Sequence, residues 1–148
     1  MTVVAQSAKI ASGKWKVRWF PKTASVAIVT GTLVEFGSGY VKQATTTAGA
    51  NNTPLAGIFI GTSVTASSSD YASNTKVPVL VPADPMAEAE IVVGTGSLAA
   101  TDVGKGFDID SDAEVTVSTT TNEPVVCTEY ISATLGKFRL KSMTPIVA

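Results

Sequence analysis

The residues best suited to bind an ion form an acidic segment in the last third of the chain. Asp108, Asp110 and Asp112 have the spacing of two residues that opens an EF-hand calcium loop. The later ligand positions do not fit, because Ala113 stands where the loop needs glycine and Thr119 stands where it needs glutamate. We therefore expect the end of a strand with outward-pointing acids, with weak calcium binding as the alternative, and we predict no dedicated metal site.

The residue types offer few groups that could act as a catalytic nucleophile or bind a cofactor. The chain has no histidine, which removes every Ser–His and Cys–His pair. The single cysteine, Cys127, lies in an apolar run and is interpreted as a small buried hydrophobe. Residues 94–96 (GTG) mimic a dinucleotide fingerprint, but Gly104 and Gly106 follow too soon for the long helix that it must open. We predict no catalytic residues, no cofactor and no enzyme.

The segment 15–20 (WKVRWF) alternates apolar and basic residues. In a strand, Trp15, Val17 and Trp19 share one face and the two bases share the other. Three roles are open: filling the core, anchoring a protein interface or stacking the bases of a single-stranded nucleic acid. The residues that we select for macromolecular contact are Lys14, Trp15, Lys16, Arg18 and Trp19.

Charge is distributed unevenly along a chain whose net charge is −1. Residues 1–34 contain five bases and no acid, residues 82–130 contain ten acids and one base, and residues 131–148 contain three bases and no acid. This pattern favours assembly, with the basic segment of one copy on the acidic body of another. Pairing within the chain and nucleic-acid binding are the alternatives, and a pI of about 5.3 opposes a dedicated nucleic-acid binder.

The cellular compartment follows from the cysteine count and the apolar runs. One cysteine forms no internal disulfide, and residues 1–20 lack the continuous apolar region of a signal peptide. The longest uncharged apolar stretch, 24–34, is too short to span a membrane. We expect a soluble protein made in a reducing cytoplasm, without a membrane or a direct nucleic-acid partner.

Alternation with a period of two dominates the chain and predicts an all-β fold. The expected strands are 15–20, 25–36, 55–60, 76–81, 89–93, 114–118, 125–130 and 137–141. Single helical turns are expected near 85–90 and 99–103, and surface loops at 45–54 and 65–75. The first twelve residues have no clear strand pattern.

The order of these short strands and turns resembles that of small capsid decoration proteins (cement, or head-stabilising, proteins) of tailed bacteriophages. The segments that carry the resemblance are LAGIFIG at 55–61, VPVLVP at 77–82, GSLAATDVGKGFDI at 96–109, VVC at 125–127, YIS at 130–132 and GKFRL at 136–140. The resemblance implies a small single-domain β-barrel or β-tulip-like fold with an extended N-terminal arm. It places the arm and first strand in residues 1–22 and the β-rich decoration domain in residues 23–148.

The same resemblance implies a function without catalysis. Such a protein binds the outer surface of the virion capsid, contacts the major capsid protein, and assembles as a homotrimer or a dimer. We expect removal of residues 1–22 to weaken capsid binding and to leave the fold intact. The alternatives are a phage tail or fibre structural protein and a carbohydrate-binding β-module.

Overall fold

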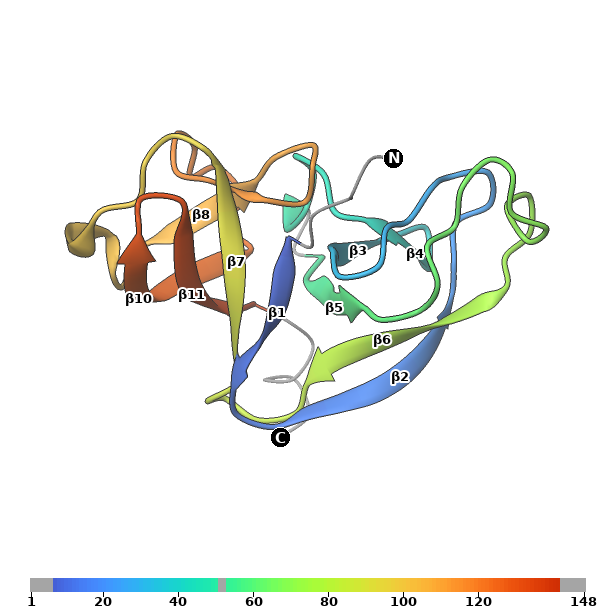
Figure 1. The fold of residues 1–148 in the computed structure, drawn as a ribbon, viewed down its shortest axis with the longest axis horizontal. Helices are drawn as coiled ribbons and strands as arrows, with labels where there is room; N and C mark the ends of the chain where they lie inside the picture. The colour runs from blue at the N-terminus through green and yellow to red at the C-terminus, as the bar shows by residue number, and fades with distance from the viewer. Residues whose placement is uncertain (1–6, 51–52, 142–148) are drawn as a thin grey trace.

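The computed structural model describes residues 7–50 and 53–141, which fold into two β-sheets (Figure 1). The first sheet contains, in spatial order, β1 (Ala8–Ser12), β7 (Glu88–Thr95), β11 (Leu135–Leu140), β10 (Val125–Ser132), β8 (Gly106–Ile109) and β9 (Val115–Thr116). The second contains β2 (Trp15–Pro21), β6 (Lys76–Pro82), β5 (Leu55–Phe59), β3 (Leu33–Gly37) and β4 (Tyr40–Gln43).

The first sheet closes on itself. β9 pairs with β8 in antiparallel fashion and also with β7 in parallel fashion, where Val93 lies opposite Val115. Strands β7, β11, β10, β8 and β9 therefore form a closed five-stranded barrel. β1 pairs with the first half of β7, on the same edge whose second half pairs with β9. Closure removes the open edges that such short strands would otherwise present. The predicted all-β class and small β-barrel are confirmed.

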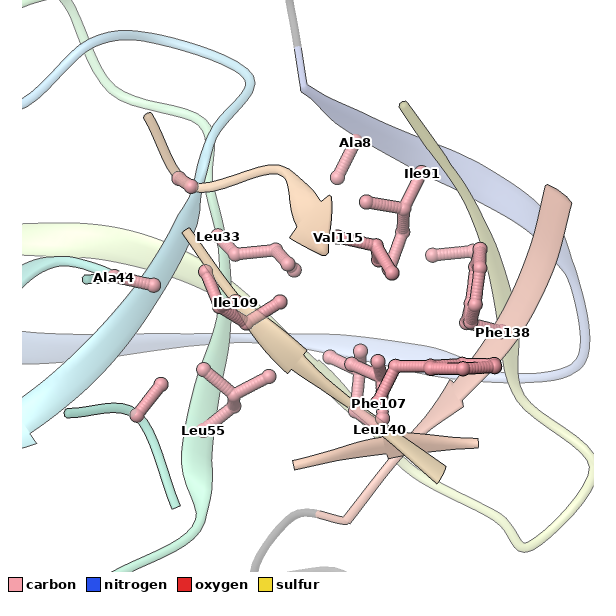
Figure 2. Close-up of a cluster of buried hydrophobic side chains, with 14 of the residues drawn as sticks. Ala8, Leu33, Ala44, Leu55, Ile91, Phe107, Ile109, Val115, Phe138 and Leu140 are labelled. Carbon is pink, nitrogen blue, oxygen red and sulfur yellow. The ribbon is translucent and has the colours of Figure 1, made fainter. Parts of the chain in front are cut away.

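One hydrophobic core joins the barrel to the second sheet. Along β7, Ala89, Ile91 and Val93 alternate inward, as the period-two pattern predicts. Leu33 and Leu55 come from the second sheet and pack in the same cluster, as Figure 2 shows. The two sheets are therefore parts of one domain.

A second cluster of buried residues packs on the second sheet. It includes Val77, Val79 and Val81 of β6 together with Phe59 of β5. The backbones of β5 and β6 approach each other closely at Gly57. A Cβ at this position would overlap the carbonyl oxygen of Leu80. Gly57 also has a φ of +149°, which glycine adopts more readily than other residues.

Several elements differ from the expected ones. Of the strand expected at 25–36, only the end forms β3, because Gly31 turns the chain at φ +82° and Ile28 makes only an isolated bridge to Val64. The helical turn expected at 85–90 is largely replaced by the start of β7, whereas 99–103 contains a 3₁₀ turn at Ala100–Asp102. Strands β1, β4 and β8 were missing from the expected set, and the strand expected at 114–118 is only two residues long.

The expected N-terminal arm and first strand, residues 1–22, are described by the structure only from residue 7 onward. Residues 1–6 of the expected arm lie outside the described residues. Residues 8–21 form β1 and β2, which pair with β7 and β6 along their lengths. In the part of the chain that the structure describes, no helix is long and apolar enough to cross a membrane.

Candidate interaction surface

Strand β2 is an edge strand of the second sheet, and most of its side chains are exposed. It has β6 as its neighbour on one side, and Figure 1 draws it along the lower right border of the molecule. Trp19 is 60% exposed and Val17 is 50% exposed, which are high values for large apolar side chains. Only at its end does the segment approach β4, where Lys22 bridges Val41.

The hydrogen-bond register shows which backbone groups of β2 remain open. The N–H of Lys22 donates to the carbonyl oxygen of Thr75 at 3.0 Å, and the N–H of Ala83 donates to the carbonyl oxygen of Lys14 at 2.7 Å. Bonding alternates along an antiparallel ladder, so the even-numbered residues of β2 bond to β6. The odd-numbered residues direct their N–H and C=O groups to the open edge, and these residues are Trp15, Val17 and Trp19.

The two faces of this edge differ in chemistry. Residues directly opposite in a ladder share a face, and Val17 lies opposite Leu80 while Trp19 lies opposite Pro78. These side chains form what we call the β2 apolar face. On the opposite face, Lys16 lies opposite Val81 and Arg18 opposite Val79, and both valines belong to the second cluster. The two exposed bases at the rim of that cluster are called the β2 basic face.

The two tryptophans have different environments. Trp15 is partly buried against the core shared by the two sheets, and its Nε1 donates to the carbonyl oxygen of Ser12 at 3.0 Å. Trp19 is mostly exposed. The core role therefore applies to Trp15, whereas Trp19 is accessible to a partner.

The predicted bases Lys14, Lys16 and Arg18 are all exposed. Within residues 7–50 and 53–141, the ion pairs involve Lys9, Lys105 and Lys137, and none of the three exposed bases takes part in one. The guanidinium of Arg18 lies 5.4 Å from the centre of the Phe20 ring. Asp84 accepts the backbone N–H of Lys14 at 3.1 Å, so a carboxylate lies near the start of the edge, whereas Lys16 and Arg18 form no ion pair within the described residues.

Lys22, the last base of the N-terminal segment, belongs to the interior. It is fully buried, and its Nζ donates to the carbonyl oxygens of Tyr71 at 3.0 Å and Ser73 at 2.6 Å. Lys22 thus anchors the loop at 65–75 and is not part of the exposed edge.

Sequence reasoning missed the residues outside β2 that complete the apolar face. Pro78 and Leu80 of β6 are half-buried, and Ile60, which donates its N–H to the carbonyl of Pro78, is 39% exposed. Residues 77–82 (VPVLVP) are apolar at odd and even positions alike, which was a signal that both faces of this strand are apolar.

The acidic segment contains one structural carboxylate. Asp108 is buried, so the expectation that all these acids point outward is wrong at this residue. Its Oδ1 accepts the N–H groups of Asn122 and Glu123, each at 2.7 Å, and its Oδ2 accepts that of Thr121 at 3.0 Å. Burial alone would raise the pKa of Asp108, but these bonds and that of Thr119 together hold it below its usual value.

The remaining acids of this segment cluster in a loop. Ligand oxygens of Asp110, Asp112 and Glu114 lie within 4.8 Å of one another, so the group has donors that could hold a hard cation. Burial, and then the charges of Asp110 and Asp112, raise the pKa of Glu114. Asp110 also accepts the N–H groups of the other two residues at 2.8 and 3.2 Å, and these hydrogen bonds organise the turn.

The other candidates for chemistry have structural roles. Cys127 is buried, as predicted, and burial raises the pKa of its thiol, which keeps it protonated and unreactive. A polar pocket beside the β3–β4 hairpin is lined by Glu35 and Lys42. The carboxylate of Glu35 accepts the N–H and hydroxyl of Thr45, each at 2.7 Å, and the hydroxyl of Thr47 at 3.0 Å, so it holds the following loop.

Comparison with known proteins adds no relative. No known family model and no curated protein matches the chain.

Proposed function

We propose that the protein is a non-enzymatic structural protein that binds the outer surface of a phage capsid and stabilises the head by cementing subunits of the major capsid protein. The observation that carries this proposal is the exposed edge of β2, where Trp19 on one face alternates with unpaired bases on the other along a strand that pairs with β6. The similarity of segments between Gly57 and Leu140 to capsid decoration proteins supports the choice of partner.

Tryptophan and arginine are favoured anchors of protein interfaces. Trp19 offers a large apolar side chain at low conformational cost, because the strand that carries it is already ordered. Arg18 and Lys16 add positive charge that steers the chain toward an acidic surface. At the start of the strand, the exposed Lys14 and the part of Trp15 that the core leaves uncovered complete the contact.

Self-association makes a modest contact sufficient. In this proposal the protein sits on the virion surface as a homotrimer or a dimer, and each copy engages a different capsid subunit. Linked contacts gain avidity without additional area per copy. Ligands that bind only the assembled shell stabilise it by mass action.

The buried carboxylates support a role without catalysis. Glu35 and Asp108 are buried, and their oxygens accept hydrogen bonds from backbone or threonine groups. Carboxylates that are hydrogen-bonded in this way hold loops in place. Together with the absence of histidine from the sequence, this favours an assembly protein.

The experiment that tests the proposal is the copy number of the chain in density-purified particles of the phage that encodes it. Quantitative staining against the major capsid protein should give about one copy per subunit or a simple fraction of it. A few copies per particle would instead indicate a tail or fibre component. Complete absence from the particle would overturn the structural role.

One observation favours a second candidate, a carbohydrate-binding module. An exposed tryptophan can stack on a sugar ring, and Trp19 is the most exposed aromatic side chain of the described residues. Binding of the native chain to a glycan array, lost in Trp19→Ala, would select this alternative.

A further inference from the structure

The open edge of β2 accepts one particular kind of partner backbone. We infer that β2 binds an extended protein segment that adds to the sheet as a further strand, with acidic residues over the β2 basic face and apolar residues over the β2 apolar face. This inference rests on the proposed function only in naming the capsid protein as the source of that segment.

The first step of the argument is the backbone. Trp15, Val17 and Trp19 direct N–H and C=O groups away from β6, and within the described residues no hydrogen bond is recorded for these backbone groups. An edge with unpaired backbone groups is a template for strand addition. Proline, which would block an edge of this kind, occurs in β2 only at its last position, Pro21.

The second step is the alternation of side chains. A segment that pairs with β2 must place alternate residues over each face. Residues over Val17 and Trp19 contact the apolar face, and residues over Lys16 and Arg18 contact the basic face. Because no carboxylate of the described chain pairs with these bases, an acidic partner residue would supply the missing charge.

The third step explains why a second copy of β2 is a poor occupant. Two copies that pair edge to edge about a two-fold axis are antiparallel, and the register that uses all three open residues is centred on Val17. This register places Lys16 opposite Arg18 of a second copy, twice. Like charges directly opposite in a sheet are destabilising. The bases thus disfavour self-pairing and favour an acidic strand.

Hydrogen exchange with a peptide probe tests the inference independently of any capsid. The probe is a synthetic peptide in which glutamate alternates with valine, and its control has lysine in place of glutamate. We expect the glutamate peptide to slow amide exchange at Trp15, Val17 and Trp19 of the full chain. Amides of Lys16 and Arg18, already bonded to β6, should not change. No protection at the three open amides, or equal protection by the lysine peptide, would overturn the inference.

Two variants at one residue separate backbone pairing from side-chain contact. Val17→Pro removes an open N–H without removing a bond to β6, whereas Val17→Thr keeps the N–H and loses only part of the apolar contact. We expect Val17→Pro to weaken peptide binding by more than about tenfold, and Val17→Thr by about twofold to threefold. Equal losses in the two variants would contradict strand addition.

A charge reversal keeps the inference testable if Val17→Pro proves unstable. The double variant Lys16→Glu, Arg18→Glu should bind the lysine peptide in preference to the glutamate peptide. An unchanged preference would overturn the assignment of an acidic partner.

Capsid binding distinguishes a failure of this inference from a failure of the proposed function. If Val17→Pro binds phage heads as tightly as the native chain, the function stands and the capsid protein is not the source of the segment that pairs with β2. If the peptide protects the open amides but the chain is absent from particles, strand addition stands and the capsid role is wrong.

Discussion

At the scale of single residues, the tryptophans of β2 show that identical side chains four positions apart can have separate tasks. Trp15 packs on the shared core and donates a hydrogen bond to Ser12, whereas Trp19 is exposed. The alternation of the sequence placed both on one face, which is correct. The packing of the two sheets decides which part of that face is buried, and it covers Trp15 but not Trp19.

Because the two tryptophans are buried to different extents, we predict that replacing them with alanine lowers the free energy of unfolding by different amounts. Trp15→Ala should lower the free energy of unfolding by about 2 kcal/mol, because it removes partly buried packing. Trp19→Ala should change it by less than about 0.5 kcal/mol, because its side chain is largely in water. Urea denaturation of both variants measures this, and a larger loss for Trp19→Ala would contradict the exposed placement.

Asp108 predicts a dependence of stability on pH. Its pKa in the folded chain is below the ordinary aspartate value of about 3.9. It therefore stabilises the fold above that pH, and this stabilisation is lost as the pH falls through the lower folded-state pKa. Asp108→Asn should cost about 3 kcal/mol at pH 7, because a donor replaces an acceptor facing backbone N–H groups.

The measurement is denaturation between pH 2 and 7, where the gap between native and Asp108→Asn should narrow toward acid. Asp70→Asn is the matched control, since no hydrogen bond or ion pair is recorded for the Asp70 carboxylate in the described chain. A gap that stays constant with pH would show that the charge of Asp108 is not what stabilises the turn.

Glu114 predicts a dependence of stability on pH opposite to that of Asp108. Its raised pKa means that its contribution favours the fold below the ordinary glutamate value of about 4.3 and is lost as the pH rises through the folded-state pKa. Glu114→Gln should therefore stabilise the protein at pH 7, by less than about 1 kcal/mol, and have little effect at pH 4. Thermal melts in a buffer with a chelator check this, and destabilisation at pH 7 would contradict it.

At the scale of elements, β1 and β2 are structural members of the fold. Ser12 of β1 donates to a carboxylate oxygen of Glu88 at 2.6 Å, and Lys9 pairs with Glu90 at 3.6 Å. β2 pairs with all seven residues of β6, and Lys22 anchors the following loop. The expectation that residues 1–22 could be removed without harm to the fold does not agree with these contacts.

We predict that a chain beginning at residue 23 loses stability together with binding. Removing both strands exposes the flank of β7 and the bonding edge of β6, so the melting temperature should fall by more than about 10 °C. Circular dichroism melts of the truncated and full chains measure this. A truncated chain that melts like the full one would show that β1 and β2 are not needed for stability. Because we expect the truncation to destabilise the fold, point variants in β2 are the better test of binding.

Element prediction succeeded where alternation was strict and failed where it was short or interrupted. The segments 55–60, 76–81, 89–93, 125–130 and 137–141 form strands. Alternate residues are buried along 76–81, 89–93 and 137–141, whereas every residue of Leu55–Phe59 is buried. The segment 25–32 is apolar but runs as irregular chain, where Thr30 donates its hydroxyl hydrogen to the carbonyl of Gly61. β1 and β4 have weak patterns and exist because β7 and β3 offer them edges.

At the scale of the whole molecule, the shared core makes the barrel and the second sheet depend on each other. Ala8, Leu33 and Leu55 lie in one cluster with Ile109 and Phe138 of the barrel, as Figure 2 shows. Trp15 of β2 and Leu80 of β6 also pack against this cluster, so the sheet that carries the β2 edge is fixed to the barrel by buried contacts. We expect this packing to keep the open edge of β2 ordered before a partner arrives.

We predict a single cooperative unfolding transition for the whole chain. The ratio of calorimetric to van't Hoff enthalpy should be about 1. Leu33→Ala in the second sheet should cost about 2–5 kcal/mol and lower the transition of the barrel with it. A second transition, left unchanged by Leu33→Ala, would show that the two sheets unfold separately.

The sequence by itself determined the all-β class, the burial of Cys127 and the two faces of the segment at 15–20, because these depend on residue type and on a period of two. Only the tertiary structure decided that Asp108 and Lys22 are buried, that Trp19 is exposed, and that Pro78 and Leu80 extend its apolar face. Those properties depend on which strands become neighbours. Neighbours are set by packing between residues distant in the chain, and no local pattern records that packing.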